Sequence, residues 1–238
     1  MANISTSYLG LNVPSPVIAG SSGLTKNIDT LVKLEKNGVG AVVLKSLFEE
    51  QIALETKKVE HAAGDNYYPG VEDYFLNYTK QNSIYEYLML IQKAKAAVKI
   101  PVIASINCTS SSEWTGFASE IEKAGADALE LNIFMLPSDF SKQGEEYEKV
   151  YFDIISAIKK QVKIPVAVKI GKHFSGLANF IQKLSFTGIE GIVLFNRFLS
   201  FDLDIEKFDA TPSRNALSSP EEIASTLRWI ALLSDKDK

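Results

Sequence analysis

Short apolar runs alternate with longer amphipathic segments along most of the chain. The apolar runs are rich in Val, Ile and Leu, which is typical of buried β-strands, and the amphipathic segments are typical of helices that bury one face. We predict strands at residues 15–21, 41–46, 101–107, 128–134, 165–170 and 191–196. We predict helices at residues 27–37, 83–98, 111–124, 145–161, 176–186 and 219–234.

One sequence motif occurs twice, as "VKIPVIAS" at 98–105 and as "VKIPVAVK" at 162–169. Each copy follows a lysine-rich amphipathic segment, so each predicts the same succession of helix, short loop, proline and buried strand. Proline at the start of a strand removes no hydrogen-bond donor that the sheet needs. Such junctions are typical of a parallel sheet whose strands are connected by helices.

The regular series of βα units favours an α/β fold of the (β/α)8 TIM-barrel type. A doubly wound sheet stays open as the alternative, because strand order cannot be seen in the sequence. A complete barrel has about 250 residues, and excursions at 48–82 and 197–218 take up much of this chain. Only six units are therefore visible. We predict a single barrel domain over residues 1–238, incomplete at its C-terminus, and a natural protein that is longer.

Composition narrows the function classes. The chain has 238 residues, 46% of them hydrophobic and 23% charged, with a net charge of −4 and no basic cluster, which argues against nucleic acid as the partner. No apolar run is long enough to span a membrane, and the N-terminus does not resemble a signal peptide. The single cysteine, Cys108, fits a reducing compartment. We therefore expect a cytoplasmic protein whose partner is neither nucleic acid nor membrane.

Polar side chains gather toward the carboxyl ends of the predicted strands. Because side chains alternate across a strand, Val166, Val168 and Ile170 share one face and Ala167 and Lys169 the other. We expect the small residues and Lys169 to face the barrel axis. The polar residues near the carboxyl ends of the strands are Lys45, Ser105, Asn107, Glu130, Asn132, Lys169 and Asn196.

Such a ring of polar groups needs hydrogen-bond partners if it is buried. Glu130 could neutralise Lys45 or Lys169, which would make the lysine a structural ion-pair member, but this does not account for the amides. A planar heterocycle with many acceptors and a tendency to carry negative charge would satisfy the whole ring.

At these positions the chain resembles the dihydroorotate dehydrogenase family of FMN-dependent barrels, over nearly its whole length. Five segments carry the resemblance in order. They are "SPVIAGSSGLT" for the first strand and the turn beside the flavin, "VVLKSL" for the flavin-contacting lysine, "AGADALELNI" for the Glu-Leu-Asn strand, "IPVAVKI" for the second flavin lysine and "LFN" for a substrate asparagine.

The resemblance implies a flavin-dependent oxidoreductase of pyrimidine biosynthesis that oxidises dihydroorotate to orotate, with hydride passing to flavin N5. Lys169 would stabilise negative charge on the reduced flavin, which gives it a catalytic role. The implied FMN contacts are Ser21, Ser22, Gly23, Lys45, Ser46, Asn107, Asn132 and Lys169. The implied substrate contacts are Lys45, Asn132 and Asn196. Relatives often form homodimers, and a soluble electron acceptor is expected.

The chain departs from the family where the proton-accepting base is expected. The family carries a cysteine or serine in Asn-x-Ser-Cys-Pro-Asn, whereas "NIFMLPSDF" (132–140) places Met135 there, and a thioether is no useful base. Another group could serve, and the candidates are Ser138, Asp139 and Cys108. Alternatively the substrate differs and needs no such base, or the activity is lost. The glycine-rich turns that hold the flavin phosphate in the family are also not visible here.

Two other functions stay open. The first is a non-catalytic or different-substrate barrel that binds a flavin or nucleotide, which Met135 favours. The second is a phosphate-binding lyase or isomerase with a Schiff-base lysine. A metal site is not expected, because His61 and His173 are far apart and lack clustered carboxylates. His173 follows a strand closely enough to contact a ligand phosphate or carboxylate.

Overall fold

The main sheet of the protein is parallel, and its strands are joined in chain order. The computed structural model describes residues 3–48, 71–107, 114–197, 201–212 and 219–234. The strands, in spatial order, are β3 (Ile18–Ala19), β4 (Ala41–Val43), β6 (Val102–Asn107), β7 (Ala128–Asn132), β8 (Val166–Ile170) and β9 (Gly191–Leu194), with β5 (Leu47–Phe48) also paired to β6. A doubly wound sheet reverses its order at a switch point, and this sheet does not. The predicted barrel-type α/β fold is confirmed, as an open arrangement of six βα units between β3 and β9 in the described residues.

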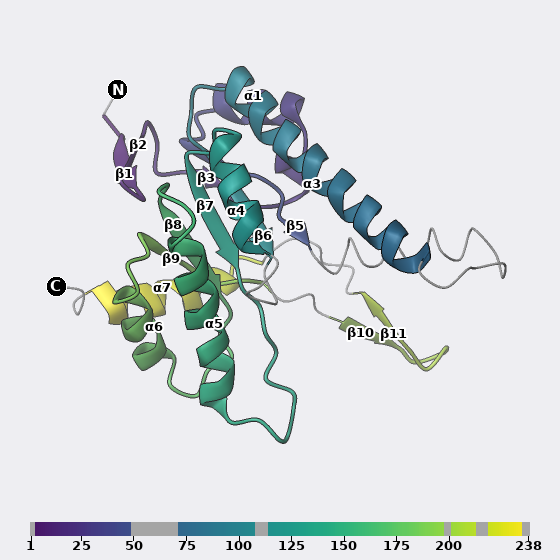
Figure 1. The fold of residues 1–238 in the computed structure, drawn as a ribbon. Helices are drawn as coiled ribbons and strands as arrows, with labels where there is room; N and C mark the ends of the chain where they lie inside the picture. Colours follow the sequence, from purple (N-terminus) through teal and green to yellow (C-terminus); the bar gives the residue numbers. More distant parts are fainter. Residues whose placement is uncertain (1–2, 49–70, 108–113, 198–200, 213–218, 235–238) are drawn as a thin grey trace.

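The helices cover one face of this curled sheet (Figure 1). They are α1 (Ile28–Lys36), α3 (Val71–Ala97), α4 (Trp114–Lys123), α5 (Gly144–Lys159), α6 (Leu177–Ser185) and α7 (Glu222–Ser234), with a 3-10 turn η1 (Gly23–Thr25) after β3. Gly38, Gly125 and Gly188 follow three of the helices and have φ between 78° and 95°, as expected for helix-ending glycines.

The two faces of the sheet pack into two separate apolar cores, as strand alternation predicts. Val166, Val168 and Ile170 belong to the large core between sheet and helices, and Ala167 belongs to a smaller core on the inner face. The inner core is closed by an unpredicted antiparallel hairpin of β1 (Thr6–Tyr8) and β2 (Leu11–Val13), which inserts Leu9 and Val13. The hairpin fills the amino-terminal end of the half-barrel, where Leu9 and Val13 pack with Ala41, Ala128 and Ala167.

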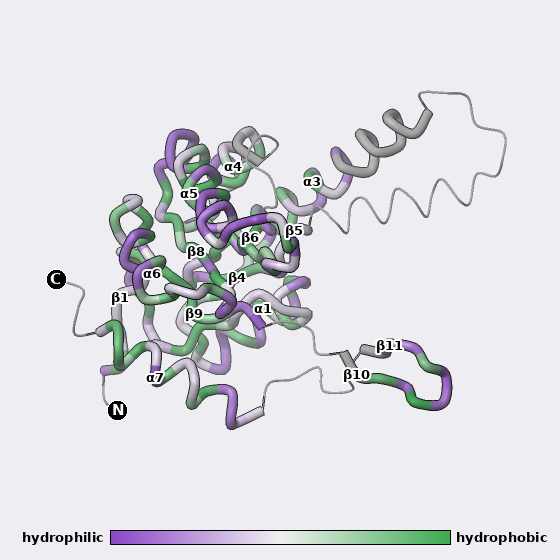
Figure 2. Tube along the Cα trace, turned by 90° about the horizontal axis from the view of Figure 1, so that it is seen from below, coloured by the Kyte–Doolittle hydropathy of each residue, from purple (hydrophilic) through white to green (hydrophobic). Residues whose placement is uncertain are grey.

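Both excursions contain more regular structure than expected. Helix α3 begins at Val71, inside the predicted excursion 48–82, and residues 49–70 lie outside the described part. In the excursion 197–218, β10 (Phe201–Asp204) and β11 (Asp209–Pro212) form an antiparallel hairpin. Figure 2 shows this hairpin projecting away from the body of the molecule. The first excursion was therefore predicted too long at its C-terminal end.

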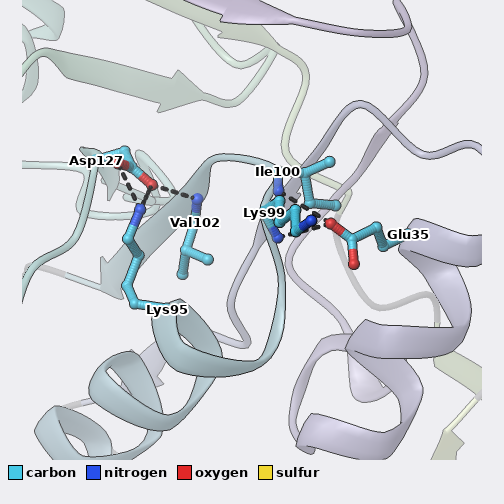
Figure 3. A network of polar contacts seen from close by, with 6 residues as sticks. All are labelled: Glu35, Lys95, Lys99, Ile100, Val102 and Asp127. Atoms are coloured by element: carbon cyan, nitrogen blue, oxygen red, sulfur yellow. Dashed lines mark hydrogen bonds and ion pairs between the residues drawn. The ribbon is translucent and has the colours of Figure 1, made fainter.

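The first copy of the repeated motif is held by two carboxylates (Figure 3). Glu35 of α1 accepts hydrogen bonds from the two backbone N–H groups before Pro101, at 2.6 and 3.2 Å. Asp127 accepts a hydrogen bond from the N–H of Val102 at 2.7 Å and forms an ion pair with the ammonium of Lys95 at 2.6 Å. The proline lacks an N–H, so the donors on either side of it are each satisfied by a separate side chain.

The second copy repeats this arrangement. Glu122 of α4 accepts the two N–H groups before Pro165, at 3.0 and 3.2 Å, and Glu190 accepts the N–H of Val166 at 2.6 Å and the ammonium of Lys159 at 2.7 Å. Desolvation works to raise the pKa of Glu190, but these hydrogen bonds and the charge on Lys159 outweigh it, and the pKa is lowered. The two copies of the sequence motif therefore have the same carboxylate contacts at the amino-terminal face of the sheet. In barrel proteins this face contributes to stability, whereas the active site lies at the opposite face.

A β-bulge interrupts the pairing of the second strand with β6. Val43 is opposite Ile103 in β4, but Leu47 is opposite Ile106 in β5, so one strand has one residue more than its partner. The backbone of Ser105 bonds instead to the phenol of Tyr87 from α3, with the N–H donating at 2.7 Å and the C=O accepting at 2.8 Å. One buried hydroxyl therefore replaces a missing rung of the sheet.

We expect Tyr87→Phe to lower the free energy of unfolding by roughly 2 kcal/mol, because it leaves a buried N–H and a buried C=O without this partner. Urea denaturation of the ligand-free protein measures the effect. Tyr85→Phe is the matched control, since Tyr85 lies on the same helix and is 62% exposed. Equal stability of the two variants would show that the hydrogen bonds between Tyr87 and the Ser105 backbone do not stabilise the sheet.

Candidate functional site

Three polar residues lie side by side on neighbouring strands at the carboxyl end of the sheet. In the strand register Asn107 is opposite Asn132, and Asn132 is opposite Lys169. The two asparagines are buried, and Lys169 is half-buried. Asn196 joins this row, since its Nδ2 donates to Asn132 Oδ1 at 2.8 Å. Strand β9 ends at Leu194, so Asn196 reaches the row from the following loop rather than by strand alternation.

Two groups of this row lack a partner among the residues that the structure describes. Asn107 Oδ1 is buried and accepts no hydrogen bond from any of them. The ammonium of Lys169 forms no ion pair or side-chain hydrogen bond within the described residues. Buried polar atoms are nearly always hydrogen-bonded in native proteins. An acceptor without a donor and a cation without an anion therefore mark a place where a polar ligand would bind.

Glu130 lies deeper inside the half-barrel and is 3% exposed. Its burial raises the pKa of the carboxyl group, while the charge of Lys169 and a hydrogen bond from Ser105 act in the opposite direction. Lys169 thus influences Glu130 electrostatically, but the two do not form an ion pair. The interpretation of Lys169 as a simple partner of Glu130 does not fit this geometry.

A chain of hydroxyl groups leads from Glu130 to the turn after β3. Ser105 Oγ donates to Glu130 Oε1 at 3.3 Å, and Ser46 Oγ lies 2.7 Å from Ser105 Oγ. Ser21 Oγ lies 3.0 Å from Ser46 Oγ and accepts the Ser46 backbone N–H at 2.8 Å. The connection was not predicted, because it depends on the bulge that turns Ser46 toward the interior.

The rest of the turn after β3 is held by its own hydrogen bonds. Ser22 caps η1 by accepting the N–H of Leu24 at 3.3 Å, and Thr25 Oγ1 accepts the N–H of Ser22 at 3.2 Å. A Cβ on Gly23 would meet no atom within 4 Å, so the space above this backbone is open. The side chain of Ser22 is thus committed to the turn, and Gly23 leaves room for a group to approach.

Lys45 lies in the bulge and lines a pocket of about 660 Å³ between α1 and α3. Lys26, Lys93 and Tyr85 lie on other walls of this pocket, and Ser46 borders it from the strand side. Lys45 is half-buried, and within the described part of the chain its ammonium has no ion pair. The structure therefore brings Lys45 next to the serine chain.

Neither Met135, at the base position of the family, nor the candidate bases Ser138 and Asp139 after it join the row. Met135 packs partly buried against the large apolar core, and Ser138 is exposed. Asp139 is exposed as well and accepts the hydroxyl and N–H of Ser141, and these two bonds hold its pKa below the usual value. Cys108 and His61 lie outside the described residues.

His173 lines a second cavity, of about 820 Å³, between the carboxyl ends of β8 and β9 and the start of α7. Asn196 and Arg197 also line it. Among the residues that the structure describes, no group of three metal-binding side chains comes together. Within the same residues, no helix combines the length and the apolar character needed to cross a membrane.

The fold and the row of polar side chains define a (β/α)-barrel protein with a candidate ligand site at the carboxyl ends of its strands. The family model for dihydroorotate dehydrogenase matches residues 3–217, and the chain belongs to this family.

Several curated relatives are similar over most of the chain. The "Dihydroorotate dehydrogenase B (NAD(+)), catalytic subunit" of Thermoplasma volcanium is 27% identical, over 86% of this chain and 65% of that protein. The protein of the same name from Methanocaldococcus jannaschii is 26% identical, over 85% of this chain and 65% of that protein. The "Dihydroorotate dehydrogenase A (fumarate)" of Limosilactobacillus reuteri is 25% identical, over 93% of this chain and 72% of that protein. The chain spans about 65% of the length of the first two relatives.

Among solved structures, a phosphonopyruvate hydrolase in complex with oxalate and Mg²⁺ is similar, with a TM-score of 0.47 and 14% identity over 78% of this chain and 60% of that one.

Proposed function

We propose that this chain forms the flavin-binding part of an FMN-dependent oxidoreductase that acts on a small planar ring compound of the dihydroorotate type. The observation that carries the proposal is the row of Asn107, Asn132 and Lys169, in which a buried amide oxygen and a half-buried ammonium have no hydrogen-bond or ion-pair partner in the described part of the chain. Membership of the dihydroorotate dehydrogenase family supports it.

The side chains present are chemically suited to a flavin. The ring system of FMN is bordered mainly by hydrogen-bond acceptors and by one N–H donor. Lys169 supplies a cation for the acceptors, and the free Oδ1 of Asn107 is an acceptor for an N–H group. When bound, FMN would supply a hydride acceptor at its N5 atom.

Each of the other residues has a task in this proposal. Lys169 offers a fixed positive charge where the site accumulates negative charge. Lys45, Ser46 and the turn of Ser21, Ser22 and Gly23 contact the cofactor. Asn132 and Asn196, already joined at 2.8 Å, present their remaining amide groups to the ring substrate.

Met135 favours a second candidate, a barrel of this family that binds flavin but acts on a different substrate or on none. A thioether offers no basic atom for a proton from carbon. Ser138 and Asp139, the described substitutes, are exposed. This candidate shares the flavin site with the first and differs only in the reaction.

The absorption spectrum of the whole purified protein tests both candidates. We expect a yellow protein, or a colourless one that takes up added FMN, and we expect anaerobic dihydroorotate to bleach the bound flavin. Flavin that binds without bleaching would favour the second candidate. Absence of any flavin binding, together with borohydride trapping of a carbonyl substrate on a lysine, would replace both with the Schiff-base lyase or isomerase.

We further place the protein in the cytoplasm, with a small-molecule substrate and a soluble electron acceptor. The homodimer implied by the family stays a prediction, and sedimentation of the whole protein measures it.

A further inference from the structure

Glu130 is a buried acid that a chain of serine hydroxyls connects to the proposed flavin site; among the described residues its carboxyl group has one hydrogen bond. Its hydrogen-bonded neighbour is Ser105, which is fully buried, and the chain continues through Ser46 to the half-buried Ser21. The three links measure 3.3, 2.7 and 3.0 Å. The chain therefore runs without a break from the interior of the half-barrel to the turn after β3.

A hydroxyl has one proton to donate and two lone pairs, so the direction of each bond in the chain determines the next. When Glu130 is ionised it accepts only, and Ser105 must donate to it. Ser105 then accepts from Ser46, and Ser46 accepts from Ser21. Ser21 also accepts the backbone N–H of Ser46, which leaves it with one free lone pair. In this state Ser21 can offer the site only a hydrogen-bond acceptor.

A protonated Glu130 that donates to Ser105 reverses every bond. Ser105 donates to Ser46, and Ser46 donates to Ser21. Ser21 then receives both the hydroxyl and the N–H of Ser46, so both of its lone pairs are used. Its own O–H becomes free, and Ser21 offers the site a hydrogen-bond donor.

Glu130 is the member of this hydrogen-bonded chain whose side chain can lose or gain a charge. The charged or titratable groups that face it are Lys169 from β8, Tyr8 from β1 and Tyr87 from α3. Burial raises the pKa of Tyr8 to about 12 and raises that of Tyr87 as well, so both phenols stay neutral. Burial also raises the pKa of Glu130 above its usual value, and it outweighs the charge of Lys169 and the hydrogen bond from Ser105, which lower it.

We propose that Glu130 is a positioning residue for the cofactor: through Ser105 and Ser46, its charge state decides whether Ser21 donates or accepts a hydrogen bond at the turn after β3. This inference rests on the proposed function, because it takes that turn to face FMN. The flavin ring is bordered mostly by acceptors, so the donor state binds it better. FMN affinity should therefore be higher on the acid side of the Glu130 titration.

The test is the pH dependence of FMN affinity, measured by quenching of flavin fluorescence on the whole protein between about pH 5 and 8. We expect the wild type to bind FMN about fivefold more tightly at the acid end, the effect of gaining one neutral hydrogen bond. Glu130→Gln removes the titrating group, and Ser46→Ala cuts the chain while leaving Glu130 and Lys169 in place. Ser15→Ala is the control, because Ser15 is also buried and its hydroxyl accepts the N–H of Val17 at 3.2 Å, outside the serine chain.

The inference is supported if the pH dependence is lost in both Glu130→Gln and Ser46→Ala and is kept in Ser15→Ala. It is overturned if Ser46→Ala keeps the wild-type pH dependence, since Glu130 would then act through space, or if the wild type shows none. Ser105→Ala cuts the next link and answers the same question should Ser46→Ala fail to fold. A wild type that binds no FMN at any pH would contradict the proposed function. If the wild type binds FMN and Ser46→Ala has the same pH dependence of FMN affinity, this inference alone is wrong.

Discussion

Gly40→Ala should lower the free energy of unfolding by at least about 3 kcal/mol, at the upper end of the range for overpacked sites. A Cβ at this position would overlap the carbonyl oxygen of Ser15, and two further backbone atoms of Ser15 would lie within 2.9 Å of it. Backbone atoms cannot rotate away as a side chain can. The neighbouring segments would have to separate.

Separation has consequences for the edge of the sheet. The N–H of Gly40 donates to the carbonyl of Val17 at 2.7 Å, and β3 pairs only through Ile18 and Ala19 with β4. Moving the backbone at Gly40 would strain this short strand. Because the turn of Ser21 to Gly23 follows β3 directly, we expect the variant to lose affinity for FMN together with stability.

Gly116→Ala is the matched control for the substitution. Gly116 lies in α4, and a Cβ there would meet no atom within 4 Å. Alanine is favoured over glycine in a helix by about 1 kcal/mol, so this variant should be slightly more stable than the wild type. Thermal or urea unfolding of the two variants gives the comparison. A Gly40→Ala protein as stable as Gly116→Ala would show that the contact with Ser15 relaxes easily.

The fold could be predicted well from the sequence because its main signals are local. Alternation along "IPVAVKI" separates the two cores correctly, and the repeat of "VKIPV" marks two equivalent junctions. The hairpin of β1 and β2 was missed. It has short strands and its turn residues Leu9 and Gly10, with φ of 53° and 74°, give a weak signal in a sequence without an alignment.

The candidate site could be predicted only in part. Asn107, Asn132 and Lys169 do lie in register, since alternation on regular strands places them on one face. The serine chain and the position of Lys45 depend on the bulge between β4 and β5. A bulge is one extra residue in one of two paired strands. It cannot be predicted from the sequence of either strand alone, because it depends on how the two strands pair. Tyr87, which makes the bulge possible, lies 18 residues from Ser105 on a helix.

Lys169→Met should weaken FMN binding by roughly 10- to 150-fold, the equivalent of losing one hydrogen bond to a charged group. Methionine keeps the length of the side chain and removes the charge, so the effect isolates the ammonium. Lys169→Arg keeps a positive charge and should retain most of the affinity. Lys123→Met, on the exposed surface of α4, should bind FMN as the wild type does.

The stability of the same variants separates a ligand-binding lysine from a structural one. Within the described residues the ammonium of Lys169 has no ion pair or hydrogen bond, so Lys169→Met should leave the free energy of unfolding of the ligand-free protein nearly unchanged at a pH low enough to protonate Glu130. The charge of Lys169 opposes the burial effect on Glu130, so its removal should raise the pKa of Glu130 further. Loss of stability with unchanged FMN affinity would mean that Lys169 serves chiefly to neutralise Glu130. In that case Lys169 would be present for the stability of the fold, the asparagines of the row would have a different role, and the flavin would have to bind elsewhere on the half-barrel.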